Sequence, residues 1–252
     1  MLTSLRLISR LDLKGDSVIK GFQMEGLRKV GSPQELATKY VTEGIDELFL
    51  FDSVASLYKR EVMYGLIGVL TSSFMVPITV SGGIKNLAQA HKIFRAGADR
   101  VGVNTGAVTN PDLISQISDM YGSQALVLSL EVKRFRDRWR VYGDAGRNDL
   151  GFYLEEYLLR VPLERVGEIL LTCVDTDGTL NGFPTDLLAS LRGLNQSIII
   201  SGGISSGEEI ASLATENYFV KGVALGRALH ENVVSVNSLK FYLKARGFEV
   251  RT

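Results

Sequence analysis

Short apolar runs alternate with amphipathic stretches along the whole chain. The runs are almost continuous in apolar character, as is typical of parallel strands that are covered on both faces. They predict eight strands, at residues 6–12, 48–52, 78–81, 100–104, 125–131, 169–173, 197–201 and 221–225.

Residues that favour helix N-termini stand between these runs. Ser32-Pro33 with Glu35 predicts an N-cap, a proline at the first helical position and a capping-box glutamate. Asn110-Pro111 repeats the cap-then-proline signal, and Asn86 begins a weaker capping box. Each predicted strand is therefore followed by a predicted helix.

Eight strand–helix units without a composition break predict the α/β class and a single (β/α)8 barrel. A doubly wound open sheet is the structural alternative. Its dinucleotide-binding fingerprint, G-x-G-x-x-G, is missing after the first predicted strand. The length of 252 residues is close to that of a one-domain barrel, and we expect one domain over 1–252.

The chain also repeats itself at half length. Asp12 corresponds to Glu131, at an offset of 131 − 12 = 119 residues. Ser81-Gly82-Gly83-Ile84 recurs 120 residues later as Ser201-Gly202-Gly203-Ile204, and Glu47 matches Glu168 at an offset of 121. Matches in order at nearly one offset indicate an internal repeat. They predict two similar half-barrels, at about 1–122 and 123–252.

Composition narrows the class of protein. Lys plus Arg (28) equals Asp plus Glu (28), so nothing predicts a nucleic-acid partner. Cys173 is the single cysteine, which favours a reducing compartment, and no apolar run is long enough to predict a membrane span. We expect a cytoplasmic protein without a membrane partner. Lacking a cluster of metal ligands, the sequence predicts no metal and no cofactor.

Two carboxylates end the equivalent strands of the two halves. Asp12 and Glu131 are predicted on the barrel rim where catalysis takes place, and the first and fifth strands of such a barrel lie opposite each other. A facing pair of carboxyl groups can act as general acid and general base if their surroundings separate their pKa values. The alternative is that each carboxylate caps a loop or binds a nearby lysine.

Glycine pairs follow the third and seventh strands. Gly82-Gly83 and Gly202-Gly203 allow backbone N–H groups to approach an anion closely. The next strand of each half ends in small or polar residues, at Asn104-Thr105 and Gly226-Arg227. Because barrels often hold a phosphate at such loops, the duplication predicts a substrate with a phosphate at each end. Ordinary tight turns are the alternative.

The sixth strand ends in a further candidate segment. Asp177-Gly178 could shape a turn that faces a phosphate, and Thr172 or Asp175 could meet a substrate hydroxyl. An Asx-type turn explains the same residues equally well.

At these residues the chain resembles the HisF family, whose members are cyclase subunits of imidazole glycerol phosphate synthase. The likeness extends from about Leu5 to Val250, through segments such as Gly44-Ile45-Asp46-Glu47-Leu48, Gly97-Ala98-Asp99-Arg100-Val101 and Asp177-Gly178-Thr179. In this family a partner glutaminase supplies ammonia through the barrel. The cyclase subunit uses this ammonia to cyclise and cleave a bisphosphate ribulosyl aminoimidazole carboxamide in histidine biosynthesis.

The resemblance implies roles for particular residues. Asp12 would be one catalytic carboxylate, Glu131 stands where the other lies, and Lys20 would contact the substrate. Asp99 would lie on the face of the N-terminal barrel end that docks a HisH-like glutaminase. Phosphate contacts are implied at Gly83, Asn104, Thr105, Asp177, Gly178 and Gly203, and an ammonia gate at the barrel bottom at Arg6, Glu47, Arg100 and Glu168. The alternative for the gate residues is an ion-pair network that only closes the barrel.

Two residues depart from the family pattern. Glu131 replaces an aspartate, and its extra methylene moves the carboxyl group by roughly 1.5 Å. A misplacement of about 1 Å can cost ~10²-fold in rate. Arg10 replaces a small residue and, by strand alternation, should point into the barrel with Asp12. We expect Arg10 to pair with Glu131, which would hold Glu131 ionised and weaken it as a general acid.

Three functions are therefore compared. The first is the cyclase of histidine biosynthesis, with retention of its activity open because of Arg10 and Glu131. The second is a HisF-like paralogue that channels ammonia to a sugar amidotransferase in surface-polysaccharide biosynthesis. The third is a HisA-like sugar-phosphate isomerase, which only the segment Gly226-Arg227-Ala228-Leu229 favours.

Overall fold

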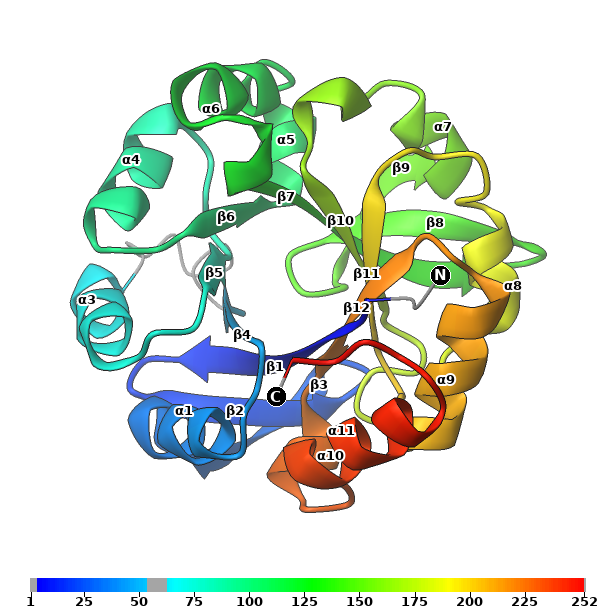
Figure 1. The fold of residues 1–252 in the computed structure, drawn as a ribbon. Coiled ribbons are helices and arrows are strands. Elements are labelled where there is room, and N and C mark those ends of the chain that lie inside the picture. Colours follow the sequence, from blue (N-terminus) through cyan, green and yellow to red (C-terminus); the bar gives the residue numbers. More distant parts are fainter. Residues whose placement is uncertain (1–3, 54–62, 252) are drawn as a thin grey trace.

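The computed structural model describes residues 4–53 and 63–251. Parallel strands in these residues form a closed barrel (Figure 1), in which β12 pairs with β1 and β10 pairs with β7. The barrel strands in chain order are β1 (Arg6–Lys14), β4 (Glu47–Asp52), β5 (Ile78–Ser81), β6 (Arg100–Val103), β7 (Leu126–Phe135), β10 (Glu168–Cys173), β11 (Ser197–Ser201) and β12 (Val220–Leu225). All eight predicted strands and the (β/α)8 fold class are confirmed.

Helices surround the barrel on the outside (Figure 1). The described α-helices are α1 (Pro33–Thr42), α3 (Tyr64–Ser73), α4 (Leu87–Arg95), α5 (Thr105–Thr109), α6 (Leu113–Tyr121), α7 (Leu154–Leu158), α8 (Thr185–Ala189), α9 (Gly207–Glu216), α10 (Arg227–His230) and α11 (Val236–Ala245). Short 3-10 turns lie at η1 (Ser123–Ala125) and η2 (Leu163–Arg165). None of the helices in the described residues is long and apolar enough to cross a membrane.

The predicted helix caps are confirmed at two of three positions. Ser32 and Asn86 accept hydrogen bonds from backbone N–H groups in the first turns of α1 and α4. At Asn110-Pro111 the prediction is wrong, because α6 begins only at Leu113. Asn110 instead ends α5, and its carbonyl accepts the N–H of Leu113. The proline therefore lies in the turn between two helices.

A hairpin extends the first strand of each half above the barrel. Strand β1 continues into β2 (Ser17–Phe22) and β3 (Glu25–Gly31), and β7 continues into β8 (Arg138–Gly143) and β9 (Asn148–Tyr153). The registers of strand pairing correspond as well. Asp12 pairs with Phe51 and Glu131 pairs with Thr172, and Phe51 and Thr172 occupy equivalent positions four residues after Glu47 and Glu168. The two halves thus share details of strand pairing that the sequence repeat only suggests.

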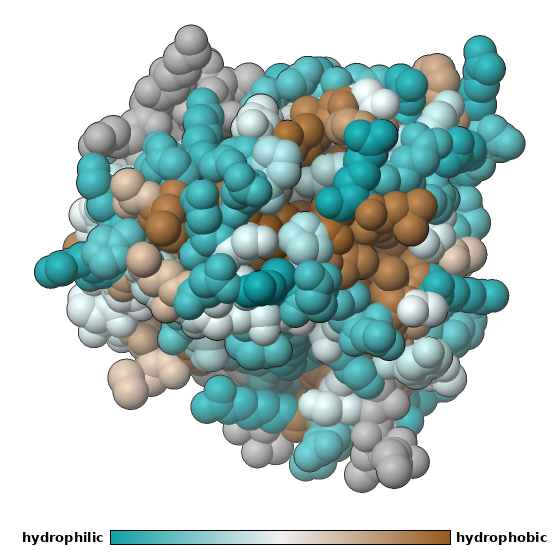
Figure 2. Space-filling view, turned by 90° about the horizontal axis from the view of Figure 1, so that it is seen from above, coloured by the Kyte–Doolittle hydropathy of each residue, from teal (hydrophilic) through white to brown (hydrophobic). Residues whose placement is uncertain are grey.

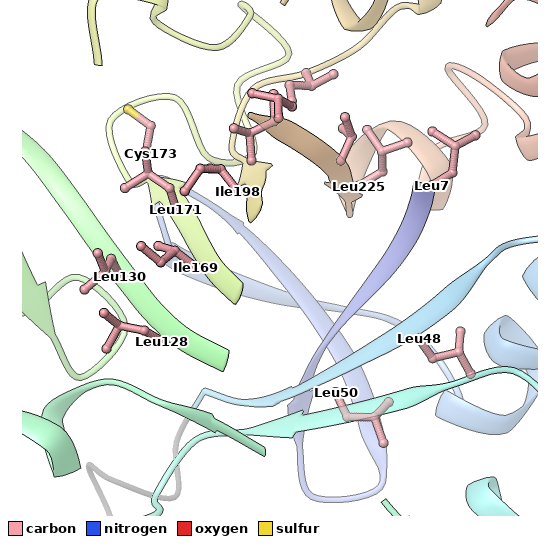
Figure 3. Packing of buried hydrophobic residues seen from close by; sticks show 14 of the residues in the cluster. Leu7, Leu48, Leu50, Leu128, Leu130, Ile169, Leu171, Cys173, Ile198 and Leu225 are labelled. Carbon is pink, nitrogen blue, oxygen red and sulfur yellow. The ribbon is translucent and has the colours of Figure 1, made fainter. Parts of the chain in front are cut away.

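Apolar side chains pack on both sides of the barrel wall. A large cluster fills the space between strands and helices, and Figure 3 labels several of its members on strands around the barrel, among them Leu7, Leu128 and Ile198. A smaller cluster fills the lumen, with Ile8 and Phe49 among its members. This double burial explains why the strands are nearly continuous apolar runs. The face in Figure 2 is a mixture of hydrophilic and hydrophobic residues.

Candidate active site

The two predicted carboxylates lie on the same rim, on opposite walls of the barrel. Asp12 and Glu131 stand near the carboxyl ends of β1 and β7, with three barrel strands between them in either direction. Both are buried, at 6% and 2% exposure. The structure therefore brings them to one end of one lumen.

Asp12 is held by two cations. Its Oδ1 accepts a hydrogen bond from Arg10 Nε at 2.7 Å, and its Oδ2 accepts one from Lys20 Nζ at 2.8 Å. Burial opposes ionisation, but the charges of Arg10 and Lys20 outweigh it and lower the pKa of Asp12 to about 2. Asp12 is thus a carboxylate that stays ionised at neutral pH.

Glu131 has the opposite environment. Its Oε2 accepts the backbone N–H of Gly146 at 2.9 Å, a weaker partner than a cation. Burial raises the pKa of Glu131 to about 7, even though this hydrogen bond and the charge of Arg10 act to lower it. The surroundings separate the pKa values of the two carboxyl groups, which is the condition for one acid and one base.

The expected pair between Arg10 and Glu131 is wrong. Arg10 points into the barrel as predicted and is 2% exposed, yet no ion pair joins it to Glu131, although both lie in the described part of the chain. Residues two apart on a strand share a face, so Asp12 is nearer to Arg10 than a residue on the opposite wall. Glu131 is consequently not held in its ionised form, and the predicted loss of general-acid strength does not follow.

The first glycine pair and the end of β6 line one cavity. Gly82, Gly83, Asn104 and Thr105, which we call the first cradle, border a cavity of about 380 Å³ that extends to Glu131. A Cβ atom on Gly82 would lie 2.3 Å from the carbonyl oxygen of Asp52, so only glycine fits this turn. The sequence missed Lys85 and Thr109, which also line this cavity.

The second glycine pair lines a much smaller cavity. It measures about 10 Å³ and is bordered by the residues that we call the second cradle, Asp177, Gly178, Gly202, Gly203, Gly226 and Arg227. Arg227 donates to the carbonyl oxygen of Gly178 and to Glu231. Since a water molecule needs about 10–15 Å³, this cradle is nearly closed.

Lys20 connects the second cradle to the carboxylates. Its Nζ lies 2.8 Å from Asp12 Oδ2 and 2.8 Å from Asp177 Oδ2. Thr172 lies beside this group, and its Oγ1 accepts a hydrogen bond from Arg10 at 3.1 Å. Three predicted contact residues, Lys20, Thr172 and Asp177, therefore meet around Asp12.

The tips of the two hairpins meet above this site. Arg147 Nη2 donates to the carbonyl oxygen of Met24 at 3.2 Å, which joins the β8–β9 loop to the β2–β3 turn. Met24 and Ala145 belong to the apolar cluster of the lumen. The sequence predicted no role for either tip, because the contact joins residues far apart in the chain.

The predicted gate residues form a closed ring of ion pairs at the opposite end of the barrel. Glu47 lies 2.7 Å from Arg6 Nη1 and 2.6 Å from Arg100 Nη2, and Glu168 pairs with the same two arginines. We call these four residues the ion-pair ring. Asp99 lies at the same end, exposed, and accepts the backbone N–H of Ile78 at 2.8 Å.

Side chains that commonly bind metals are dispersed over the described residues. No group of three or more His, Cys, Asp or Glu side chains in residues 4–53 and 63–251 could hold a metal ion. Among the described residues, the polar groups at this rim include the two carboxyl groups, Lys20, Thr172 and the side chains and backbone of the two cradles.

Comparison with known proteins gives a consistent picture. A family model described as "Histidine biosynthesis protein" matches residues 6–235. The chain is 42% identical to the imidazole glycerol phosphate synthase subunit HisF of Legionella pneumophila over 210 residues, which cover 82% of this chain and 99% of that protein. It is 38% identical to the HisF proteins of Natranaerobius thermophilus and Dictyoglomus thermophilum, over 98% of this chain and 98% of each relative.

Proposed function

Because the chain belongs to the histidine biosynthesis protein family, with HisF relatives matched over nearly its whole length, we propose that it is the cyclase subunit of an imidazole glycerol phosphate synthase. In this role it uses ammonia to cyclise and cleave a bisphosphate ribulosyl aminoimidazole carboxamide. The observation that carries the proposal is the opposed pair of buried carboxyl groups, Asp12 and Glu131, between two glycine cradles.

The two carboxyl groups divide the chemistry. Glu131, whose pKa is about 7, gives and takes protons near neutral pH. Asp12 stays ionised and stabilises positive charge that develops when ammonia replaces an oxygen of the substrate. Both groups are preorganised, because the strands that carry them are fixed on both sides by neighbouring barrel strands.

The two cradles differ in how much they must rearrange to bind a phosphate. The first cradle is open, and its cavity of about 380 Å³ accepts one phosphate without rearrangement. The second cradle is nearly filled, and its Arg227 donates to the Gly178 carbonyl, so the other phosphate would take the place of this carbonyl as the partner of the guanidinium. Arginine binds phosphate more strongly than it binds a neutral carbonyl, which favours that exchange.

A glutaminase subunit is the proposed source of ammonia. The HisF relatives are named as subunits of a synthase, which supports a heterodimer. We place the docking face at the end of the barrel that carries the ion-pair ring and Asp99, away from the carboxylates. Ammonia would enter through the ring and reach Asp12 and Glu131 through the lumen.

The test uses the purified chain with an ammonium salt and the ribulosyl substrate. We expect formation of imidazole glycerol phosphate, and loss of that product in Asp12→Asn. The same assay separates the alternatives. An isomerase would convert the aminoaldose precursor without ammonia. A paralogue that only delivers ammonia would form no imidazole product but would still stimulate its glutaminase, and this outcome would overturn the proposal.

The paralogue loses one of the two departures that favoured it. Arg10 pairs with Asp12 and not with Glu131, whereas the glutamate at position 131 in place of an aspartate remains. The isomerase is favoured only by the sequence around Arg227, where the side chain lies against Gly178 and Glu231.

A further inference from the structure

Arg10 spans the lumen just below the two carboxyl groups. Its backbone belongs to β1, its Nη1 donates to Thr172 Oγ1 on β10 at 3.1 Å, and its guanidinium lies 4.8 Å from the centre of the Phe51 ring on β4. Strands β4 and β10 are opposite walls of the barrel. The guanidinium is therefore fixed from both sides, in a place where it has almost no access to solvent.

Arg10 also balances the charge of a buried cluster. Arg10 and Lys20 supply two positive charges, and Asp12 and Asp177 supply two negative ones, with all four residues at most 8% exposed. Removal of one member of a buried cluster of ion pairs leaves another charge unpaired. The resulting loss of folding stability is larger than the net stability that an intact buried pair contributes. Without Arg10, two carboxylates would share the single ammonium group of Lys20.

We propose that Arg10 is a positioning residue for the proposed reaction: it completes a neutral buried cluster that keeps Asp12 ionised and leaves proton exchange to Glu131. The inference rests on the proposed function, but its effect on Asp12 is a property of the chain itself. This role could not be predicted from the sequence, from which we expected Arg10 to pair with Glu131.

The charged and titratable groups around both carboxyls agree with this assignment. Asp12 faces Arg10 and Lys20 directly, with Asp177 behind Lys20, Glu131 across the rim and His230 behind β1. The charges of Arg10, Asp12 and Asp144 act on Glu131, and within the described part of the chain its carboxyl group accepts the N–H of Gly146. Direct cationic contacts are thus concentrated on Asp12.

Two measurements test the inference on wild type, Arg10→Met and Arg10→Lys. The first follows the Asp12 carboxyl carbon by NMR in chains with ¹³C-labelled aspartate, assigned with Asp12→Asn. In wild type the Asp12 carboxyl group should stay ionised down to about pH 4. In Arg10→Met the same group should titrate at least about one pH unit higher than in wild type. Arg10→Lys should restore most of the wild-type behaviour, because it restores the charge.

The second measurement is the pH dependence of kcat with saturating ammonium salt. In Arg10→Met an acidic limb should appear at the pH where Asp12 takes up its proton in the NMR titration, with kcat reduced about 10-fold one pH unit below that midpoint and KM changed less than about threefold. A merely structural role would lower activity equally at every pH. Arg10→Gln, which also removes the charge but keeps a polar side chain, should show the same acidic limb and serves if Arg10→Met does not fold.

The outcomes separate this inference from the proposed function. An Asp12 titration that is the same in wild type and Arg10→Met overturns the role of Arg10, whatever the activity. A shifted titration in a chain that forms no imidazole product keeps the role of Arg10 and overturns the proposed function. A shifted titration with an unchanged pH profile of kcat overturns the claim that catalysis needs ionised Asp12.

Discussion

At the scale of single residues, two carboxyl groups at repeat-related positions have different chemistry because of what their oxygens contact. The sequence located both Asp12 and Glu131, since strand ends and the internal repeat are visible in it. It could not give their protonation, because Lys20 and Gly146 reach them from hairpins that fold back over the rim. Arg10 shows the same limit: its inward direction followed from alternation, but its partner depended on distances that only the fold sets.

The pH dependence of the reaction follows from Glu131. If its protonated form donates to the leaving group, kcat should fall as pH rises through about 7, by about tenfold per pH unit well above that value. Glu131→Gln should lose the activity at every pH, and Glu131→Asp should retain part of it. A profile of kcat that stays flat from pH 6 to pH 9 would show that another group supplies the proton.

The same pKa predicts a pH-dependent stability. A carboxyl group whose pKa is raised in the folded state contributes stability that is complete below its ordinary pKa of 4.5 and is lost as pH rises through about 7. Glu131 should therefore cost the fold roughly 3 kcal/mol at pH 9 relative to pH 4. Glu131→Gln should remove this loss in urea unfolding curves, whereas Glu208→Gln on the exposed face of α9 should not.

At the scale of elements, the barrel strands were predictable and the first hairpin was not. Barrel strands are covered on both faces, which leaves a continuous apolar signature. Strand β3 is mostly exposed on both faces, so it has neither an apolar run nor an alternating pattern. The contact between Arg147 and Met24 lies beyond any local pattern, because it depends on where two separate turns end in space.

The glycine cradles make an element-scale prediction. Gly202 has a φ of +110°, and a Cβ atom there would lie 2.4 Å from the carbonyl oxygen of Cys173. Gly202→Ala should lower the free energy of unfolding by about 3 kcal/mol and weaken phosphate binding. Gly44 has a φ of +85°, but a Cβ atom there would meet open space, so Gly44→Ala should cost only about 1 kcal/mol. If urea unfolding gave the two variants equal losses in free energy of unfolding, backbone strain alone would account for both, and the contact with the Cys173 carbonyl would contribute nothing.

At the scale of the whole molecule, the ion-pair ring joins strands that are far apart in the sequence. Arg6, Glu47, Arg100 and Glu168 come from β1, β4, β6 and β10. The sequence offered these residues only through a family resemblance and one repeat-related pair, Glu47 with Glu168. The contacts establish that the ring is closed, while the passage of ammonia through it is part of the proposed function.

Breaking the ring should destabilise the barrel. Glu168→Gln leaves Arg6 and Arg100 to share Glu47, and we expect a loss of about 2 kcal/mol, since the ring is buried but not fully removed from solvent. Glu164→Gln, at an exposed position nearby in sequence, is the matched control. Chemical denaturation of both variants at one pH measures the difference. A Glu168→Gln chain as stable as the control would mean that the ring contributes no net stability.

The ring divides unevenly between the halves of the chain. Arg6, Glu47 and Arg100 belong to the first half, and only Glu168 belongs to the second. Produced as separate polypeptides, the first fragment would carry one surplus positive charge at its mating edge and the second fragment one surplus negative charge. These opposite charges would favour the pairing of one fragment of each kind over the pairing of two like fragments, in addition to the strand pairing of β1 with β12 and β6 with β7.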